Sequence, residues 1–204
     1  MISYIVASNN PERLKKHLGR TLRLEEDDEL LVEDRPSIAV AYNEAIRKAR
    51  NAIKCFVHDD VELLDCARLR ADLIEACTGR AGMVGVIGSR NKDHFPWWGH
   101  DCCGSAVDAR VGVIDFGPGD EPCAVLDGVL LATHQDLVFD EDYPGFHLYD
   151  MDICRQMLAR GFYNYCLLGG KSLVSHHTDS PGDLHLIDRW AEAEVIYRRK
   201  WLAL

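Results

Sequence analysis

The chain has 204 residues, of which 47% are hydrophobic and 27% are charged, and its formal net charge at pH 7 is -10. This length and composition are typical of one soluble globular domain with a substantial core. The acidic balance excludes a general nucleic-acid binder, because a phosphate backbone needs a basic protein surface. Nucleotides remain open as ligands, because a bound metal ion can neutralise their phosphates.

The first third of the chain predicts alternating strands and helices. Strands are expected at residues 2–7, 29–33 and 55–57, with helices at 11–18 and 38–52 between them. A β-α-β-α-β order implies a parallel sheet with right-handed crossovers, as in nucleotide-binding half-domains. The glycine-rich dinucleotide-binding and P-loop motifs are absent from this sequence. Residues 1–64 are therefore interpreted as a nucleotide-binding half-domain that has neither the dinucleotide-binding motif nor the P-loop motif.

The rest of the chain continues the α/β pattern around one long irregular region. Its expected elements are a helix at 66–77, a strand at 82–88, a hairpin at 107–116, a strand at 124–132, a helix ending near 161, a strand at 163–168 and a helix at 184–204. The irregular region spans residues 89–119, and a loop of this length inside a compact domain is usually functional. We expect a single domain over residues 1–204, with a central sheet flanked by helices.

Two adjacent carboxylates, Asp59 and Asp60, follow His58 directly after the short apolar strand at 55–57. Open α/β sheets bind their ligands at the carboxyl ends of strands. Carboxylates this close repel one another unless a cation lies between them. Mg²⁺ and Mn²⁺ bind both carboxylate and phosphate oxygens. The motif therefore predicts a metal–diphosphate site, and the alternative is an acidic turn after a strand.

The chain contains eight cysteines, and no two of them form a C-x-x-C pair. Several lie in apolar patterns, where a free cysteine acts as a small hydrophobic residue. Cys102 and Cys103 are adjacent and follow His100 and Asp101, so a zinc site is conceivable there, but the spacing differs from that of common zinc knuckles. We favour reduced cysteines in a reducing compartment.

The first residues, 1–7, carry neither the basic segment nor the long apolar segment of a secretory signal. No stretch approaches the ~20 apolar residues that a membrane-spanning helix needs. A cytoplasmic location is therefore expected.

Five segments together resemble glycosyltransferases of the GT-A fold, in the family-2-like group of small single-domain bacterial enzymes. They are AYNEA at 41–45, FVHDDV at 56–61, VLDG at 125–128, GFHLYDMDIC at 145–154, and His176. The resemblance extends over residues 37–182. It implies the nucleotide-diphospho-sugar transferase fold with a mostly parallel central sheet. It also implies a hexosyltransferase-type enzyme that moves a sugar from a nucleotide-diphosphate sugar to an acceptor hydroxyl, with metal assistance and inversion.

In this family an Asp-x-Asp motif ends a strand and holds a divalent metal on the donor diphosphate. The first position of the motif is His58 here, and the last is Asp60. The resemblance implies Mn²⁺ or Mg²⁺ bound by Asp60 and His58, with His176 or His177 completing the site. Histidine suits Mn²⁺ better than Mg²⁺. The alternative for the two late histidines is ordinary loop polarity.

The family usually carries Glu-Asp at the start of a late helix, and this chain has Tyr149-Asp150 there. The resemblance implies that Asp150 is the catalytic base, which takes the proton of the attacking hydroxyl. The alternative for Asp150 is an acidic residue that the helix dipole favours near a helix start. Asp127 matches an acidic position that faces the donor sugar or the acceptor.

Five further residues are candidates for donor contacts. Asn9 follows the first strand, where the nucleoside usually docks, and Asp59 is assigned to the ribose or sugar. Asn43 and Glu44 are named only because they match the family's Tyr-Asn-Glu. Trp98, in the long loop, could stack on a sugar face, although core packing or a subunit contact fits an aromatic residue equally well.

Residues 83–182 are then the catalytic and acceptor half, in which the long loop and the turn after His177 shape the acceptor site. The acceptor could be a glycan, a lipid-linked molecule or another hydroxyl compound. The aromatic and basic helix at 184–204 could pack on the domain, pair with a second copy, or touch an anionic membrane surface. Two other functions stay open, namely a metal-dependent nucleotidyltransferase and a non-catalytic protein that binds sugar nucleotides or carbohydrates.

Overall fold

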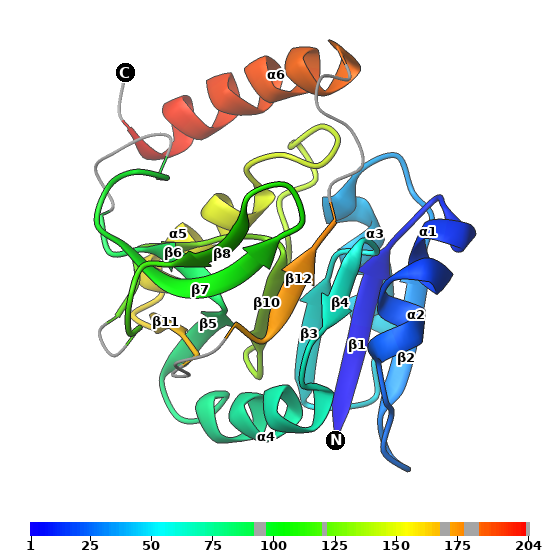
Figure 1. The fold of residues 1–204 in the computed structure, drawn as a ribbon. Coiled ribbons are helices and arrows are strands. Elements are labelled where there is room, and N and C mark those ends of the chain that lie inside the picture. The colour runs from blue at the N-terminus through cyan, green and yellow to red at the C-terminus, as the bar shows by residue number, and fades with distance from the viewer. Residues whose placement is uncertain (92–96, 120–121, 168–171, 178–183, 203–204) are drawn as a thin grey trace.

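A computed structural model describes residues 1–91, 97–119, 122–167, 172–177 and 184–202. Its first sheet contains, in spatial order, β11 (Tyr163–Cys166), β5 (Ala81–Gly85), β10 (Leu130–Thr133), β3 (Ile53–Val57), β1 (Ile2–Ala7) and β2 (Glu29–Glu33). β1 pairs in parallel with β2 and β3, and β11 pairs in parallel with β5. Only β10 runs antiparallel to its neighbours β3 and β5. The central sheet is therefore mostly parallel, as the sequence predicts (Figure 1).

A second sheet lies beside the first, and the sequence did not predict it. Its order is β4 (Val61–Leu63), β12 (Val174–His176), β7 (Cys102–Asp108), β6 (Ile87–Ser89) and β9 (Val125–Leu126), and β8 (Gly112–Asp115) pairs with β7. β12 pairs in parallel with β7 and antiparallel with β4. Because β12 lies between two strands from distant parts of the chain, its last residue, His176, lies opposite Val61, the first residue of β4.

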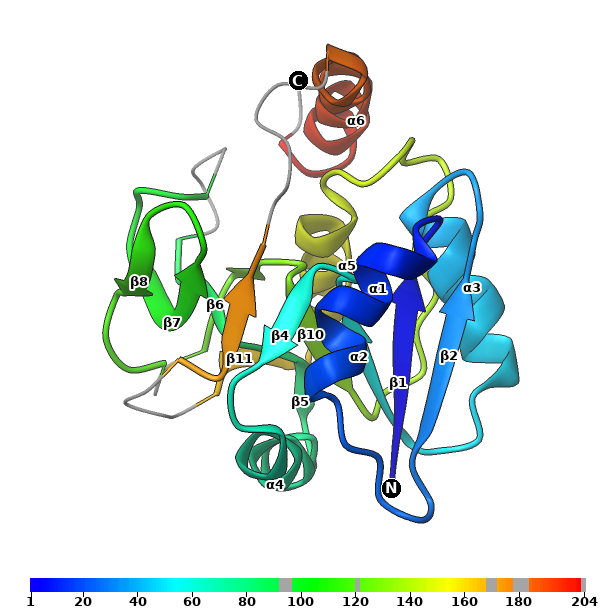
Figure 2. The ribbon, with the colours of Figure 1, turned by 45° about the vertical axis from the view of Figure 1, so that its right-hand side comes forward.

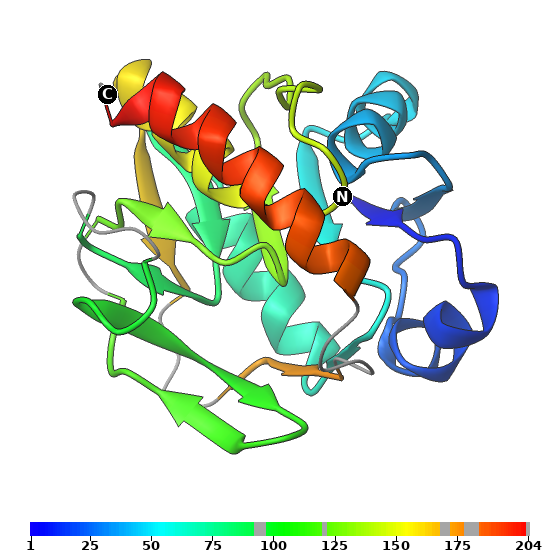
Figure 3. The same cartoon turned by 90° about the horizontal axis from the view of Figure 1, so that it is seen from above.

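The helices flank the sheets. They are α1 (Pro11–Lys16), α2 (Leu18–Thr21), α3 (Ile38–Lys48), α4 (Cys66–Ala76), α5 (Tyr149–Ala159) and α6 (Leu184–Trp201). Figure 2 shows α1 and α2 on one side of β1 and β2, and α3 on the other side. Seen from above, α6 crosses over α5 (Figure 3). The indole of Trp201 in α6 donates a 2.7 Å hydrogen bond to Asp152 of α5. Among the described residues, no helix combines the length and the hydropathy needed to cross a bilayer.

Two predicted strands are each divided between the two sheets. The strand expected at 82–88 is β5 in the first sheet and β6 in the second, and the strand expected at 124–132 is β9 in the second sheet and β10 in the first. The second division falls at Asp127-Gly128. Within β6, a Cβ on Gly88 would collide with the carbonyl oxygen of Val125 in β9, so these two backbones can approach only at a glycine. A change of sheet leaves no mark in hydrophobic periodicity, because both halves are buried.

The remaining differences are at element ends. The helix expected at 11–18 is broken at His17, whose φ of -106° and ψ of -87° are not helical. The helix expected to reach 52 ends at Lys48. The hairpin expected at 107–116 begins earlier, because its first strand, β7, starts at Cys102.

An aromatic cluster in the core joins the first sheet to the helices that carry the candidate site. Tyr42 of α3 packs on Phe56 of β3 with ring centroids 4.8 Å apart, and Phe56 packs edge-on against Phe139 at 5.0 Å. Tyr149, the first residue of α5, meets the edge of Tyr42 at 5.7 Å. All four side chains are buried. This packing fixes the start of α5 beside the carboxyl end of β3.

Candidate functional site

His58, Asp60 and His176 form one group in which a ligand atom from each lies within 4.8 Å of the others. His58 follows β3, Asp60 precedes β4, and His176 ends β12. Nε2 of His176 lies 3.3 Å from Oδ1 of Asp60. The backbone N–H of His177 donates a 3.0 Å hydrogen bond to the carbonyl oxygen of Asp60, which holds β12 against this turn. The structure thus brings together three of the four residues predicted to bind metal.

The charges in this group are mutually dependent. Burial alone would raise the pKa of Asp60, but the neighbouring His176 and His58 lower it to about 2. Burial lowers the pKa of His58, and Asp60 opposes that effect. For His176, burial also lowers the pKa, but the contact with Asp60 outweighs burial and raises it. Asp60 is therefore an anion whose charge is offset mainly by the two histidines, with a smaller contribution from Arg13.

The donor set fits a divalent cation. Oδ1 of Asp60 is buried and has no well-formed hydrogen bond to any residue that the structure describes, although it lies in ion-pair range of His176. A buried carboxylate oxygen without a hydrogen-bond donor is costly unless a cation satisfies it. Two imidazoles and one carboxylate suit Mn²⁺ and other transition ions better than Mg²⁺, which prefers oxygen ligands.

Asp59, between two of these residues, has a different environment. Its carboxylate is paired with Arg13 of α1 at 2.9 and 3.0 Å, and it accepts a 2.5 Å hydrogen bond from the hydroxyl of Ser8. A paired, bidentate arrangement of this kind also orients the loop that follows β1. The predicted contact of Asp59 with a ribose or sugar stays a prediction, and in this structure the side chain anchors α1 to β3.

Asp150 and Asp127 form a second acidic pair next to the metal-ligand group. Oδ2 of Asp150 accepts a 2.9 Å hydrogen bond from the backbone N–H of Gly128, and Oδ1 accepts one of 2.8 Å from the N–H of Met151. Burial and the charge of Asp127 nevertheless raise the pKa of Asp150 to about 7. A carboxyl group with a pKa near neutrality can both take up and release a proton at physiological pH.

Tyr149 links the two acidic groups, a role that the sequence did not reveal. Its hydroxyl donates a 3.2 Å hydrogen bond to the carbonyl oxygen of Gly128 and lies 2.8 Å from Nε2 of His58. A Cβ on Gly128 would collide with this hydroxyl, so the close approach requires glycine. A hydrogen bond to one ring nitrogen is how proteins commonly fix the tautomer and orientation of a metal-binding histidine.

A cavity of about 130 Å³ adjoins the metal-ligand group and the Asp127–Asp150 pair. Its wall contains His58, Asp127, Tyr149 and Asp150, and aromatic side chains close the other side: Trp97, Trp98, Phe146, His147 and Trp190. Trp98 is 51% exposed, and its ring centroid lies 5.6 Å from that of Trp190 in α6. The C-terminal helix therefore contributes a wall of the site, in addition to packing on the domain. The amphipathic pattern of a helix cannot show which cavity one of its aromatic residues will line.

His177 joins a separate group. Its Nε2 lies 3.5 Å from Oε2 of Glu62, and Nδ1 of His17 lies 3.4 Å from Oε1 of the same carboxylate. The rings of His17 and His177 stack with centroids 4.4 Å apart. Of the two histidines predicted as alternatives, His176 lies with Asp60 and His177 lies with Glu62.

The other predicted donor contacts lie apart from this cavity. Asn43 is 4% exposed, and it exchanges hydrogen bonds of 2.8 and 2.9 Å with the backbone of Phe139 and donates another, of 2.9 Å, to Glu141. Glu44 pairs with Arg47 on the same helix at 2.6 Å. Asn9 is exposed after β1. The predicted turn after His177, at 178–183, lies outside the described residues, as do positions 92–96 of the long loop.

A family model described as "Glycosyltransferase like family" matches residues 3–180. No curated protein matches the chain in sequence. Solved structures similar to this one include TarS of S. aureus in complex with UDP-GlcNAc (TM-score 0.56, 10% identity, 90% of this chain and 60% of that one). They also include the mannosyltransferase PcManGT from Pyrobaculum calidifontis in complex with GDP-Man and Mn²⁺ (0.56, 13%, 95% and 64%). A third is GalNAc-T7 with UDP, GalNAc and Mn²⁺ (0.57, 9%, 87% and 44%). The chain thus spans less than two thirds of the length of each of these proteins.

Proposed function

This chain belongs to that glycosyltransferase-like family and has the GT-A fold, and we propose that it transfers a sugar from a nucleotide-diphosphate sugar to an acceptor hydroxyl. One observation carries the proposal. The His58–Asp60–His176 group, in which Asp60 is buried, adjoins a cavity that His58 lines together with Asp150, whose carboxyl group has a pKa near neutrality. This combination suits inverting sugar transfer, because a cation stabilises the charge of the departing diphosphate and a base takes the proton of the attacking hydroxyl.

In the proposed reaction Asp150 accepts the proton of the acceptor hydroxyl. The acceptor oxygen forms a new bond to the anomeric carbon. The bond from that carbon to the diphosphate oxygen breaks, and the leaving oxygen keeps the electron pair. Attack and departure on opposite faces of the sugar give inversion.

His58, Asp60 and His176 would hold the divalent ion. When bound, such an ion supplies positive charge that stabilises the leaving diphosphate. Tyr149 positions His58, and the Gly128 amide positions Asp150. Solved structures of similar fold contain Mn²⁺ with UDP or GDP-Man, and this supports Mn²⁺ and a nucleoside diphosphate as the first ligands to test.

The cavity of about 130 Å³ is smaller than the roughly 300–1,000 Å³ of pockets that enclose a whole small ligand. It suits the reacting end of the substrates, with Asp127 and Trp98 beside the transferred sugar. The nucleoside would then extend toward the carboxyl ends of β1 and β3, where Asn9 is exposed.

A thermal-shift screen with UDP, GDP, dTDP and CMP, each with and without Mn²⁺, tests the proposal. A ligand at a hundredfold excess over its dissociation constant stabilises the folded state by about 2.7 kcal/mol. We expect one nucleoside diphosphate to raise the melting temperature only when Mn²⁺ is present. Absence of a shift with all four nucleotides would contradict the proposal.

A non-catalytic sugar-nucleotide-binding protein is the second candidate, and Tyr149 favours it. Its phenol stands where the family usually has a glutamate, and a phenol carries no negative charge at neutral pH. Slow hydrolysis of the bound donor sugar distinguishes the two functions, since only a glycosyltransferase would release free sugar from the nucleotide it binds. A nucleotidyltransferase is less well supported, because Arg13, the first basic residue after β1, is paired with Asp59.

A further inference from the structure

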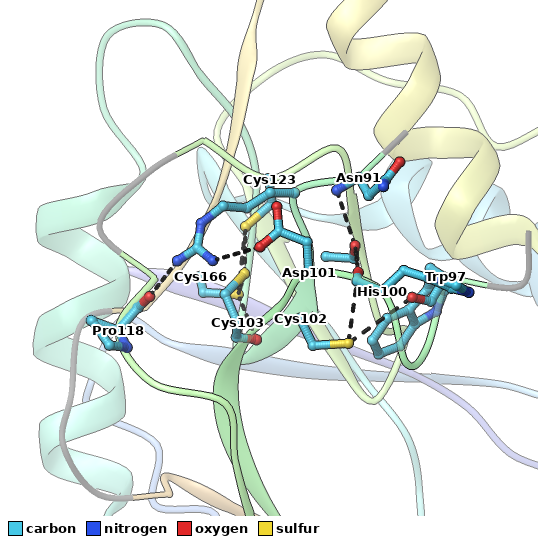
Figure 4. A network of polar contacts seen from close by, with 11 residues as sticks. Asn91, Trp97, His100, Asp101, Cys102, Cys103, Pro118, Cys123 and Cys166 are labelled. Carbon is cyan, nitrogen blue, oxygen red and sulfur yellow. Dashed lines mark hydrogen bonds and ion pairs between the residues drawn. The ribbon is translucent and has the colours of Figure 1, made fainter. Parts of the chain in front are cut away.

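Three cysteines that are far apart in the sequence converge in the core (Figure 4). Cys103 lies in β7, and Cys166 is the last residue of β11. Cys123 lies outside the named strands and forms an isolated β-bridge with Asn164. Their Sγ atoms are separated by 3.2 Å (Cys103–Cys123), 3.5 Å (Cys103–Cys166) and 3.7 Å (Cys123–Cys166). All three residues are at most 2% exposed. The group lies where the edge strand of the first sheet meets the second sheet.

The arrangement differs from ordinary packing of apolar cysteines. Other buried cysteines, such as Cys77, occupy the core without a neighbouring sulfur in hydrogen-bond contact among the described residues. Here Cys123 and Cys166 both hydrogen-bond to the sulfur of Cys103. Three sulfur atoms in mutual contact form a donor set that suits a thiophilic metal ion, which binds cysteines as thiolates.

From this convergence we infer that Cys103, Cys123 and Cys166 form a binding site for a thiophilic metal ion. Zn²⁺ is the ion whose bond lengths and angles fit the three sulfurs. Zinc–sulfur bonds of about 2.3 Å at tetrahedral angles place two sulfurs about 3.8 Å apart. The sulfurs here are 3.2–3.7 Å apart, so they would need to separate by only about half an ångström. Binding releases the thiol protons to solvent, and no oxidant is required.

The surroundings provide an entry path for an ion. A cavity of about 490 Å³ is lined by Cys166 and Gly119, and the carboxylates of Asp72 and Glu75 lie in the same wall. Within the described part of the chain, no fourth histidine, cysteine or carboxylate completes the group, so the fourth position is left to water or another small ligand. A Cβ on Gly119 would collide with the Cβ of Cys166, so the backbone at position 119 can approach Cys166 only as glycine.

The sequence had suggested a zinc site with Cys102 and Cys103 together, near His100 and Asp101. The structure separates the two cysteines. Sγ of Cys102 faces the carbonyl oxygens of Trp97 and His100 at 4.0 and 3.9 Å, away from the three-sulfur group. Only Cys103 belongs to both the expected site and the inferred one.

The test is a Cd²⁺ titration of reduced, metal-free protein without oxygen and with Mn²⁺ in excess. Thiolate–cadmium bonds produce an ultraviolet charge-transfer band, which a site of histidines and carboxylates cannot produce. We expect the band to saturate at one equivalent, and Zn²⁺ to displace it. Cys103→Ser should weaken Cd²⁺ binding at least tenfold, whereas Cys77→Ser, a matched change at another buried cysteine, should leave it unchanged.

Failure of the wild-type protein to give the band would overturn the inference, whatever the variants do. An equal band in Cys103→Ser would also overturn it, and Cys123→Ala is a second variant if the first does not fold. Counting thiols in the denatured, unreduced protein tests the remaining alternative. Two fewer than the eight cysteines would indicate a disulfide in place of a metal site. None of these measurements depends on transferase activity, so the inference and the proposed function can fail separately.

Discussion

The hydroxyl of Tyr149 lies 2.8 Å from Nε2 of His58, although 91 positions separate the two residues in the chain. The same hydroxyl lies 3.2 Å from the carbonyl oxygen of Gly128. These two contacts hold the His58 ring against the start of α5, and the tautomer of His58 decides which atom of the His58–Tyr149 pair donates. The tyrosine at the position of the family's usual glutamate thus orients the histidine at the position of its usual aspartate.

The first prediction follows from this contact. Tyr149→Phe keeps the buried ring but removes the hydroxyl, so we expect Mn²⁺ affinity to fall about 10–100-fold, as when a hydrogen-bond partner of a metal ligand is lost. The free energy of unfolding should fall by only about 1 kcal/mol. Mn²⁺ binding can be measured by electron paramagnetic resonance of the free ion.

Tyr143→Phe is the matched control, because its hydroxyl bonds to Asp152 at 3.3 Å and is absent from the cavity wall. This variant should bind Mn²⁺ as the wild type does. Equal Mn²⁺ affinity in both tyrosine variants would show that Tyr149 does not position His58.

The two adjacent histidines should respond differently to removal. His176→Ala removes the partner of Asp60, so the Mn²⁺-dependent thermal shift with the nucleotide should disappear. His177→Ala removes a partner of Glu62 and should leave that shift in place. If His177→Ala were the variant that lost the shift, the metal site would have to be reassigned to the His17–Glu62–His177 group.

Asp150→Asn should lower kcat by about 10²–10⁴-fold, because the amide cannot accept the acceptor's proton. Binding of the donor nucleotide should stay nearly unchanged, since the carboxylate contacts the Gly128 and Met151 amides and not the metal-ligand group. Transfer kinetics and calorimetric titration of the nucleotide measure the two quantities separately. Normal turnover in this variant would remove Asp150 from the mechanism.

The raised pKa of Asp150 predicts a pH dependence. The base works only when ionised, so kcat/KM should increase with pH up to a limb near 7. Because burial and Asp127 raise this pKa, Asp127→Asn should move the limb to lower pH. Carbon-13 NMR of the Asp150 carboxyl group measures the same shift without any assay of activity. A limb that stays in place in Asp127→Asn would contradict the coupling.

The raised pKa of Asp150 also predicts that stability decreases as pH increases, whereas kcat/KM increases. In the unfolded chain the carboxyl group has an ordinary pKa, below the folded value of about 7. The folded state therefore binds this proton more tightly, and its contribution to stability is complete below the unfolded pKa and is lost as pH increases through 7. Asp150→Asn should remove this contribution to the pH dependence of the melting temperature.

Asn43 tests whether a residue that matches the family acts in binding or in folding. Asn43→Ala leaves the backbone groups of Phe139 without their partner, which costs about 1–3 kcal/mol per buried unsatisfied group. We expect a lower melting temperature and unchanged nucleotide affinity below it. Glu44→Gln should change neither property. Weaker nucleotide binding in Asn43→Ala, measured where the variant is fully folded, would restore Asn43 to the donor site.

The expected family and the expected GT-A fold are both confirmed, and local patterns were sufficient for them. The short strand before His58 and the carboxylates after it could be read from consecutive residues, because burial and polarity change abruptly there. The alternation of strands and helices in the first sixty residues likewise follows from periodicity and capping. Such signals extend over a few residues, so they fix the type of element and the motif at its end.

What the sequence by itself determined was therefore a GT-A fold with an acidic motif at a strand end and a candidate base at a helix start. Tertiary structure decided which partners those residues meet. β12 lies between β4 and β7, and this pairing gives His176 to Asp60 and His177 to Glu62. Contacts such as His58–Tyr149 and the meeting of three cysteines join residues whose separation along the chain carries no local signal. They exist because two sheets pack together, and only the packed chain specifies which side chains meet at their junction.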